Sequence, residues 1–255
     1  MILAIDVGNT NIVLGCIRQK NILFTERLST DHSKTDLEHA IAIKTVLELH
    51  NIEPAQINGA IISSVVPPIT MQIKRALAKV IGCEAKVVGP GLKTGLNILM
   101  DNPAQVGSDL IVGAVAGIAE YPLPLVIVDM GTATTICVID EHKNYIGGMI
   151  LPGIQVSVNS LSSNTSQLPR ISLDPPKRLI GKNTIECMKS GILYGNASCI
   201  DGMIDRIEEE LNQKVTVVAT GGLAGTVTSL CRHNIILDDA LLLKGLLLIY
   251  EKNKN

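Results

Sequence analysis

Apolar stretches recur along the chain, and two of them end in the same polar pattern. Residues 2–5 are apolar and lead into Asp6-Val7-Gly8-Asn9-Thr10, after which apolar residues resume. Residues 125–128 lead in the same way into Asp129-Met130-Gly131-Thr132-Ala133-Thr134. Each copy continues as a second apolar stretch and then a polar turn, at residues 18–21 and 140–144. Two strand–turn–strand units with one pattern predict a duplicated domain.

Segments with helical periodicity alternate with further strand-like stretches. The pattern predicts strands at 59–66 and 215–219 and helices at 36–50, 103–120, 184–211 and 238–251, the last with Asp238 or Asp239 as its N-cap. Strands mixed with helices of this length are typical of α/β proteins. We therefore expect two lobes, residues 1–115 and 116–255, each a mixed sheet flanked by helices.

Composition narrows the classes of function. Aromatic residues make up 2% of the 255 residues and the formal net charge is −2, which argues against a protein that stacks nucleic-acid bases or binds anionic membranes. We find no apolar run near the ~18 residues that a membrane span requires. The six cysteines form no CxxC pair, and the chain starts with a strand-like segment. These features favour reduced thiols, no zinc site and a cytoplasmic protein.

The first polar pattern has the chemistry of a phosphate-binding loop. Gly8 lets backbone N–H groups approach an anion closely, and Asn9, Thr10 and Asn11 add neutral donors. Asp6 would repel a phosphate directly, but it fits a bridging Mg²⁺, which binds carboxylate and phosphate oxygens together. A polar β-turn whose Asp and Asn satisfy backbone groups is the alternative for one copy alone.

The second copy strengthens the nucleotide interpretation. Two such loops facing each other across a cleft between the lobes would grip one triphosphate, and positioning of this kind is the main work of phosphoryl transfer. The turn Thr220-Gly221-Gly222 gives a nucleoside a glycine surface to lie against. The chain contains neither the GxxxxGK[ST] pattern of a P-loop nor a GxGxxG after its first strand.

Asp109 is the candidate general base. A carboxylate within hydrogen-bond reach can accept the proton of a hydroxyl that attacks the γ-phosphorus. An Asp on a helix surface or at a helix cap is the alternative that spacing alone favours.

These motifs resemble those of the type III pantothenate kinases. The resemblance runs from Met1 to about Tyr250 and rests on the following segments in this order: Asp6–Thr10, Asp129–Thr134, Gly147–Gly153, Gln167–Arg170, Ile180–Thr184 and Thr220–Ala224. It implies an actin-like (ribonuclease H-like) duplicated fold with an ATP cleft between the lobes. It also implies ATP-dependent phosphorylation of pantothenate to 4′-phosphopantothenate, the first step of coenzyme A biosynthesis. A homodimer, Mg²⁺ and a monovalent cation, K⁺ or NH₄⁺, are implied as well.

Carried over position by position, the resemblance assigns the general base to Asp109 and the monovalent cation to Asp129. The ATP-binding positions would be Asp6, Val7, Gly8, Asn9, Thr10, Asn11, Ile12, Val13, Gly131 and Thr132. The pantothenate site would comprise Met100, Gly107, Ser108, Asp109, Leu110 and Thr184, with Thr184 contributed by the partner subunit.

Two positions depart from the family pattern. Leu110 stands where the family usually has an arginine after Gly-x-Asp, and Met100 replaces its usual tyrosine. An arginine could pair with the pantothenate carboxylate, and such a bond is worth roughly 1.5–3 kcal/mol. Arg170 or Lys182 could compensate. A kinase of another small alcohol, and a non-catalytic nucleotide-binding factor of the same fold, therefore stay open as alternatives.

Overall fold

A computed structural model describes residues 1–254, which form two compact units. Unit 1 comprises residues 1–96, 102–116 and the segment from Ala240 onward, and unit 2 comprises residues 97–101 and 117–239. The lobes expected from the sequence, 1–115 and 116–255, are each one continuous segment. In the structure the last helix instead packs within unit 1, against β1 and β4.

The sheet of unit 1 is mixed and has the strand order β3-β2-β1-β4-β5. Its strands β1 and β2 are antiparallel, as are β2 and β3, whereas β4 runs parallel to β1 and β5 parallel to β4. The strands are β1 (Ile2–Val7), β2 (Asn11–Arg18), β3 (Asn21–Ser29), β4 (Gly59–Ser64) and β5 (Lys86–Val87).

Alternation along β1 sends its side chains to two different hydrophobic layers. Leu3, Ile5 and Val7 pack with helices α1 (Asp36–Leu49) and α2 (Pro67–Ile81). Ile2 and Ala4 pack on the other face with α3 (Ser108–Glu120) and α7 (Leu241–Lys252). Because side chains alternate with a period of two, Asp6 belongs to this second face. The strand pattern thus places the first acid of the repeat on the side that α3 covers.

Unit 2 repeats the topology of unit 1. Its sheet has the order β11-β10-β7-β8-β9-β6, so that β9, β8, β7, β10 and β11 correspond to β3, β2, β1, β4 and β5 with the same directions of pairing. The strands are β6 (Asn97–Ile98), β7 (Leu125–Met130), β8 (Ala133–Ile139), β9 (Asn144–Pro152), β10 (Thr216–Thr220) and β11 (Ile236–Leu237). The predicted α/β class and the predicted pair of mixed sheets flanked by helices are confirmed.

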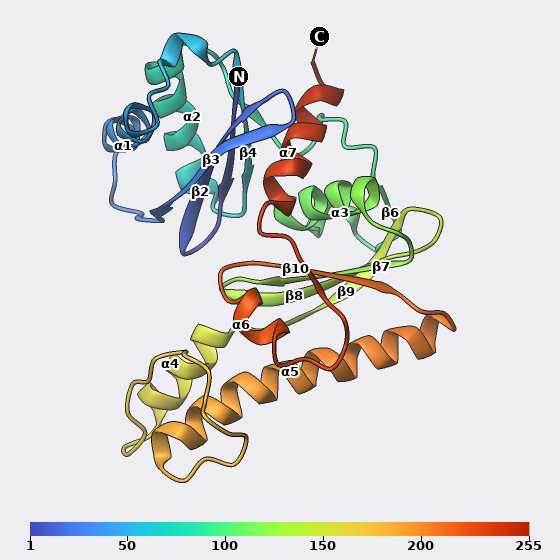
Figure 1. The fold of residues 1–255 in the computed structure, drawn as a ribbon. Coiled ribbons are helices and arrows are strands. Elements are labelled where there is room, and N and C mark those ends of the chain that lie inside the picture. Colours follow the sequence, from blue (N-terminus) through green and yellow to red (C-terminus); the bar gives the residue numbers. More distant parts are fainter. Residues whose placement is uncertain (255) are drawn as a thin grey trace. The chain divides into compact units, whose positions relative to one another are not determined.

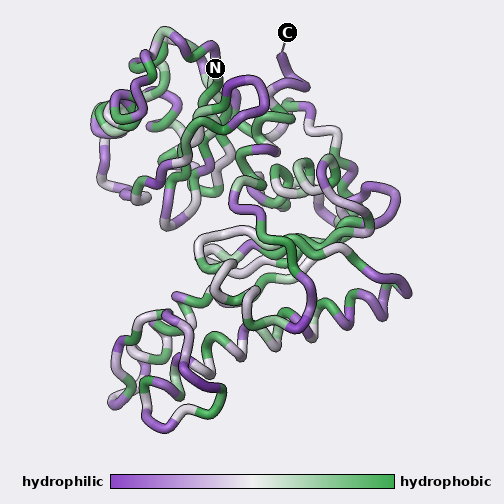
Figure 2. Tube along the Cα trace, viewed as in Figure 1, coloured by the Kyte–Doolittle hydropathy of each residue, from purple (hydrophilic) through white to green (hydrophobic). Residues whose placement is uncertain are grey.

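One face of the second sheet is covered by helices α4 (Ile154–Asn164), α5 (Thr184–Leu211) and α6 (Ala224–Thr228). Figure 1 shows α5 as a long helix along this sheet, and Figure 2 shows the central strands as hydrophobic segments. Val126, Val128 and Met130 face these helices, so the alternation turns Asp129 to the opposite face.

The structure corrects two details of the predicted helices. The helix expected at 103–120 is interrupted: a short 3₁₀ turn at Pro103–Gln105 ends at Val106, whose backbone is extended, and α3 begins at Ser108. The break puts Asp109 in the first turn of a helix. The last helix begins after Ala240, which makes no side-chain cap, and Asp238 accepts a hydrogen bond of 2.8 Å from the Tyr121 hydroxyl instead.

Candidate active site

The loop after β1 is a turn whose polar side chains face outward. The N–H of Gly8 donates to the carbonyl oxygen of Asn11 at 2.9 Å, which closes the turn. Asn9, Thr10 and Asn11 are exposed, whereas Val7 and Ile12 lie in the hydrophobic core. Val7 and Ile12 therefore can offer a ligand only their backbone.

Thr30 is a residue that the sequence analysis missed. Its hydroxyl donates to the carbonyl oxygen of Gly8 at 2.7 Å, and its N–H donates to the carbonyl oxygen of Thr10 at 3.0 Å. Two carbonyl groups of the loop are thus held by one residue just beyond β3. A threonine at a strand end carries no motif of its own, so only the strand pairing reveals this role.

The loop after β7 is enclosed by glycine backbone. The N–H of Gly131 donates to the carbonyl oxygen of Ala133 at 3.1 Å. A Cβ on Gly153 would lie 2.1 Å from the carbonyl oxygen of Thr132, and one on Gly221 would lie 2.6 Å from that of Met130. Gly221 also has a φ of +102°, which side chains rarely tolerate. Only glycine fits at these two contacts.

Strand register gives each acid hydroxyl-bearing neighbours. In unit 1, Asp6 is paired with Ser63 on β4. In unit 2, Asp129 is paired with Thr135 on β8 and with Thr220 on β10. Paired residues on adjacent strands share a face and lie about 5 Å apart. Each partly buried carboxylate therefore belongs to a polar row on the face away from the main helical layer of its sheet.

Asp109 lies at the start of α3, where its carboxylate turns back on the backbone. Its Oδ1 accepts a hydrogen bond of 2.9 Å from the N–H of Leu110. A Cβ on Gly107 would lie 2.4 Å from the same oxygen, so the glycine makes room for the carboxylate. Burial raises the pKa of Asp109 above its usual value, and the hydrogen bond from Leu110 opposes that rise in part. A partly buried acid with a raised pKa is suited to proton transfer.

The predicted site residues fall into two sets. Unit 1 contains residues 6–13 and 107–110, so Asp6 and Asp109 belong to the same compact unit. Unit 2 contains Met100, Asp129, Gly131, Thr132 and Thr184. Met100 is 39% exposed, and Thr184 is the exposed first residue of α5, next to the Asn183 cap.

The segment that precedes α5 is fastened to that helix. The carboxylate of Asp174 accepts a hydrogen bond from Lys189 at 2.7 Å, and the Ser190 hydroxyl donates to the carbonyl oxygen of Leu179. The Lys189 and Ser172 partners lower the pKa of Asp174 to about 2. Arg170 and Lys182, which could replace the missing arginine, both lie exposed on this segment.

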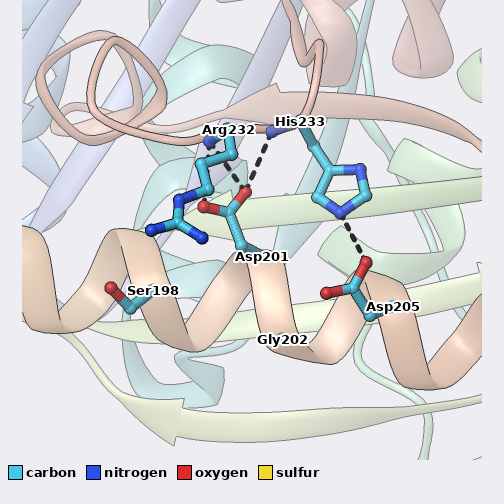
Figure 3. A pocket seen from close by; sticks show the side chains of 6 residues that line it. All are labelled: Ser198, Asp201, Gly202, Asp205, Arg232 and His233. Carbon is cyan, nitrogen blue, oxygen red and sulfur yellow. Dashed lines mark hydrogen bonds and ion pairs between the residues drawn. The ribbon is translucent and has the colours of Figure 1, made fainter.

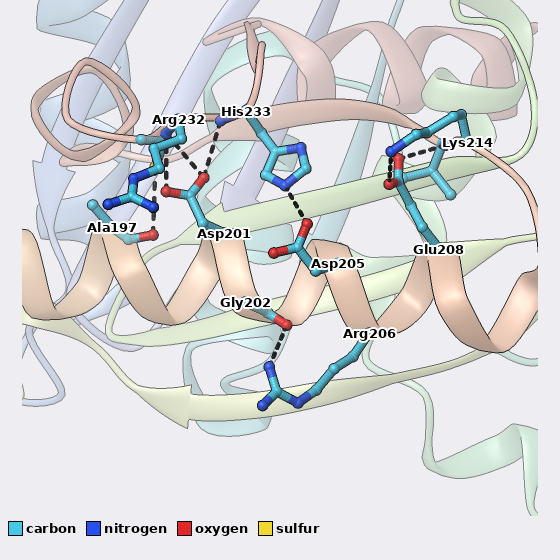
Figure 4. A network of polar contacts seen from close by, with 11 residues as sticks. Ala197, Asp201, Gly202, Asp205, Arg206, Glu208, Lys214, Arg232 and His233 are labelled. Carbon is cyan, nitrogen blue, oxygen red and sulfur yellow. Dashed lines mark hydrogen bonds and ion pairs between the residues drawn. The ribbon is translucent and has the colours of Figure 1, made fainter.

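A cavity of about 470 Å³ on α5 contains none of the predicted site residues (Figure 3). Asp201 accepts the backbone N–H groups of Arg232 and His233 at 2.9–3.1 Å, and His233 contacts Asp205 at 2.9 Å. Figure 4 shows the same contacts continuing along α5 to the pair Glu208–Lys214. Asp201 and Asp205 already have protein partners. We therefore interpret their contacts as those that attach the 231–235 segment to α5, and not as a ligand site.

Residues 1–254 carry neither a metal-ligand cluster nor a membrane-spanning helix. No three His, Cys, Asp or Glu side chains in this part of the chain gather as a metal site. No helix in it is long and apolar enough to cross a bilayer.

A family model and a related protein sequence both match this chain, and both are type III pantothenate kinases. The family model "Type III pantothenate kinase" matches residues 2–206. A type III pantothenate kinase of Bacillus cytotoxicus is 47% identical over 253 residues, which cover 99% of this chain and 97% of the relative.

Solved structures are similar over almost the whole chain. A conserved Campylobacter jejuni protein assigned to the Baf family of transcriptional activators has a TM-score of 0.59 at 22% identity, with 98% of each chain covered. The activator of 2-hydroxyisocaproyl-CoA dehydratase from Clostridium difficile, with bound ADPNP, has a TM-score of 0.56 at 13% identity and covers 100% of this chain and 98% of its own. At these identities the likeness establishes the fold alone, which is the actin-like fold expected from the sequence.

Proposed function

The chain belongs to the type III pantothenate kinase family and catalyses the ATP-dependent phosphorylation of pantothenate in coenzyme A biosynthesis; from this premise we propose that Asp109 is the general base. The observation that carries the proposal is the partly buried position of the Asp109 carboxylate. It lies in the first turn of α3, with burial raising its pKa and Leu110 binding one of its oxygens. A base whose pKa lies nearer to the working pH transfers a proton more effectively.

Asp109 accepts one proton during the transfer. The substrate hydroxyl oxygen forms a bond to the γ-phosphorus while the bond from that phosphorus to the β,γ-bridging oxygen breaks, and ADP leaves. The hydroxyl proton passes to the carboxylate oxygen that Leu110 does not bind. Asp109 thus raises the nucleophilicity of the hydroxyl at the moment of attack.

Both acid–glycine loops bind the phosphates of ATP in this proposal. The exposed Asn9, Thr10 and Asn11 supply neutral donors, and the glycine backbone around Thr132 allows close approach. Asp6 would hold Mg²⁺ together with the phosphates, because hard cations take carboxylate and phosphate oxygens. Asp129, which is paired with Thr135 and Thr220, would hold the monovalent cation, K⁺ or NH₄⁺. These oxygen donors match hard cations.

A homodimer in which Thr184 completes the partner's pantothenate site is part of the same proposal. Leu179, Ile180 and Ile185, around the start of α5, are 61%, 78% and 45% exposed. Exposed apolar side chains that gather in this way are typical of protein–protein interfaces. Sedimentation of the protein should therefore give the mass of a dimer, and replacing Ile180 by Asp should shift it toward the monomer. A cytoplasmic location fits the six free cysteines.

The test of the base is Asp109→Asn. We expect turnover of pantothenate to fall by roughly 10²–10⁴ while ATP binding changes little, because the amide cannot accept the proton. Asp36→Asn is the matched control, since Asp36 is also an acid in the first turn of a helix but pairs with Lys79. Full turnover by Asp109→Asn would show that another group is the base.

A further inference from the structure

The hydroxyl of Ser108 joins the start of α3 to the C-terminal end of β4. Its Oγ lies 3.0 Å from both the backbone N and the backbone O of Ser64, and 3.1 Å from the Oγ of Ser63. These partners are 44 and 45 positions away in the sequence. We call Ser63, Ser64 and Ser108 the serine clasp.

The three contacts use the full hydrogen-bonding capacity of the Ser108 hydroxyl, which has one donor and two acceptor positions. It donates to the carbonyl oxygen of Ser64 and accepts the N–H of Ser64. Its remaining acceptor position therefore takes the hydroxyl hydrogen of Ser63. Ser63 is fully buried. Removing the Ser108 hydroxyl would leave polar groups of β4 without this partner in a place that water reaches poorly, which costs free energy.

The clasp connects the two acids of unit 1. Ser63 is the cross-strand neighbour of Asp6, and both belong to the face that α3 covers. Asp109 is the residue after Ser108 and shares its helical turn. A path of three neighbouring residues therefore runs from the acid of the first loop to the proposed base.

The clasp also has a support behind it. The Oγ of Ser64 accepts the hydroxyl of Thr70 at 2.7 Å and the N–H of Val66 at 3.1 Å, at the start of α2. Ser64 is thus held from α2 while its backbone holds Ser108. An anchor that is itself fixed can define the position of the turn that it binds.

Given the proposed role of Asp109, we propose that Ser108 is a positioning residue: its hydroxyl fixes the first turn of α3 on β4 and so fixes the base relative to Asp6. The family resemblance assigned Ser108 to the pantothenate site; in this proposal Ser108 instead acts by positioning Asp109. A displacement of about 1 Å at a reacting group costs up to about 100-fold in rate.

The experiment compares Ser108→Ala, Ser108→Thr and Asp109→Asn with the wild-type enzyme. It measures kcat, KM for ATP, the melting temperature, and kcat as a function of pH. Ser33→Ala is the control, because Ser33 is an exposed unit 1 serine whose hydroxyl binds Asp31 within its own turn.

We expect Ser108→Ala to lower kcat roughly 10- to 100-fold with little change in KM for ATP. A looser first turn admits water to Asp109 and lowers its raised pKa, so the acid limb of the kcat profile should move to lower pH. Ser108→Thr, which keeps the hydroxyl, should restore most of the turnover and return the limb.

The proposal is overturned if folded Ser108→Ala keeps the wild-type kcat, or if its activity falls only with its melting temperature and the acid limb stays in place. If that variant does not fold, Ser63→Ala removes one partner and keeps the two bonds to Ser64. It should then move the acid limb in the same direction by a smaller amount, and an unmoved limb overturns the clasp. Full turnover by Asp109→Asn removes the base and this proposal together, whereas an inactive Asp109→Asn beside an unchanged Ser108→Ala removes the clasp alone.

Discussion

The loops after β1 and after β7 occupy the same place in two sheets of the same topology, but their surroundings differ. The first comprises residues 8–11, between the paired residues Val7 and Ile12, and the second comprises residues 131–133, between Met130 and Thr134. The first is held by the hydroxyl and the N–H of Thr30, whereas the second is pressed against the backbone of Gly153 and Gly221.

This difference suggests a division of labour after duplication. The hydrogen bonds from Thr30 fix the backbone of the first loop while its polar side chains stay exposed to a ligand. Bare glycine backbone lets a phosphate or nucleoside approach more closely than any side chain would allow. In the proposed site both loops bind the phosphates of ATP, the first through exposed polar side chains and the second through close approach of its backbone. Substitutions in each loop test this contrast.

The largest effect is expected from Gly153→Ala. The new Cβ would lie 2.1 Å from the carbonyl oxygen of Thr132. This oxygen belongs to the backbone, so it cannot move aside as the end of a flexible side chain could. We expect a loss of more than about 2 kcal/mol in the free energy of unfolding, and weaker ATP binding. Urea denaturation and calorimetric titration with ATP would measure both.

Gly8→Ala in the first loop is the matched substitution. Its Cβ would lie 3.2 Å from the carbonyl oxygen of Asn11, so a shift of a few tenths of an ångström suffices. We expect a loss below about 1 kcal/mol. Equal losses in the two variants would mean that the loops are equally enclosed.

The duplication was predictable from the sequence because the same order of apolar and polar residues occurs twice along the chain. The burial pattern along β1 and β7 is the same, with the acid partly buried at the same position in each, and the apolar residues around Asp6 and Asp129 show it directly. The order of the strands follows from the repeat. Such patterns can be recognised because they depend only on residues that are neighbours in the chain.

What the sequence could not give depends on distant residues. The interruption at Val106 that places Asp109 in a first turn is hidden by a helical pattern that continues through it. The bonds from Thr30 to the first loop and from Ser108 to β4 join segments without a shared motif. Gly153 looks like a loop glycine until the carbonyl oxygen that it touches is known. The proposed chemical role of each site residue stays a prediction until the variants are measured.

A smaller effect is expected outside the two loops, at the proposed pantothenate site, from Leu110→Arg. Leu110 follows the proposed base, at the position where the resemblance to the type III pantothenate kinases implies an arginine. If the pantothenate carboxylate lacks a cationic partner, the new guanidinium should lower KM for pantothenate roughly tenfold with kcat nearly unchanged. Steady-state kinetics with pantothenate and with a neutral amide analogue would measure it. An unchanged KM would show that another group, such as Arg170 or Lys182, already binds the carboxylate.

Asp109 should also make the stability of the enzyme depend on pH. Its pKa is raised in the folded protein, so the folded state retains a proton that the unfolded state has lost. The contribution of Asp109 to stability is therefore fully present below the ordinary aspartate pKa and is lost as pH rises through the folded value. Asp109→Asn should accordingly be more stable than wild type at neutral pH and equal to it in acid. Melting temperatures across pH 3–8 would show this convergence (a roughly even difference at every pH would contradict it).

The last prediction concerns a buried hydroxyl at the end of the second loop, at a position where the first loop has an apolar side chain. Thr134 is buried, and its Oγ1 has no hydrogen-bond partner among the described residues. In unit 1 the corresponding position, paired with the end of the first strand, is the buried apolar Ile12. Thr134→Val copies that solution and should stabilise the protein by about 1 kcal/mol, because an unpaired hydroxyl no longer has to be desolvated. Thr135→Val alters the next residue on the opposite face, beside Asp129, and should instead lower turnover. If Thr134→Val loses ATP affinity without gaining stability, the Thr134 hydroxyl takes part in binding, and the nucleotide is held by a side chain beside the second loop as well as by its glycine backbone.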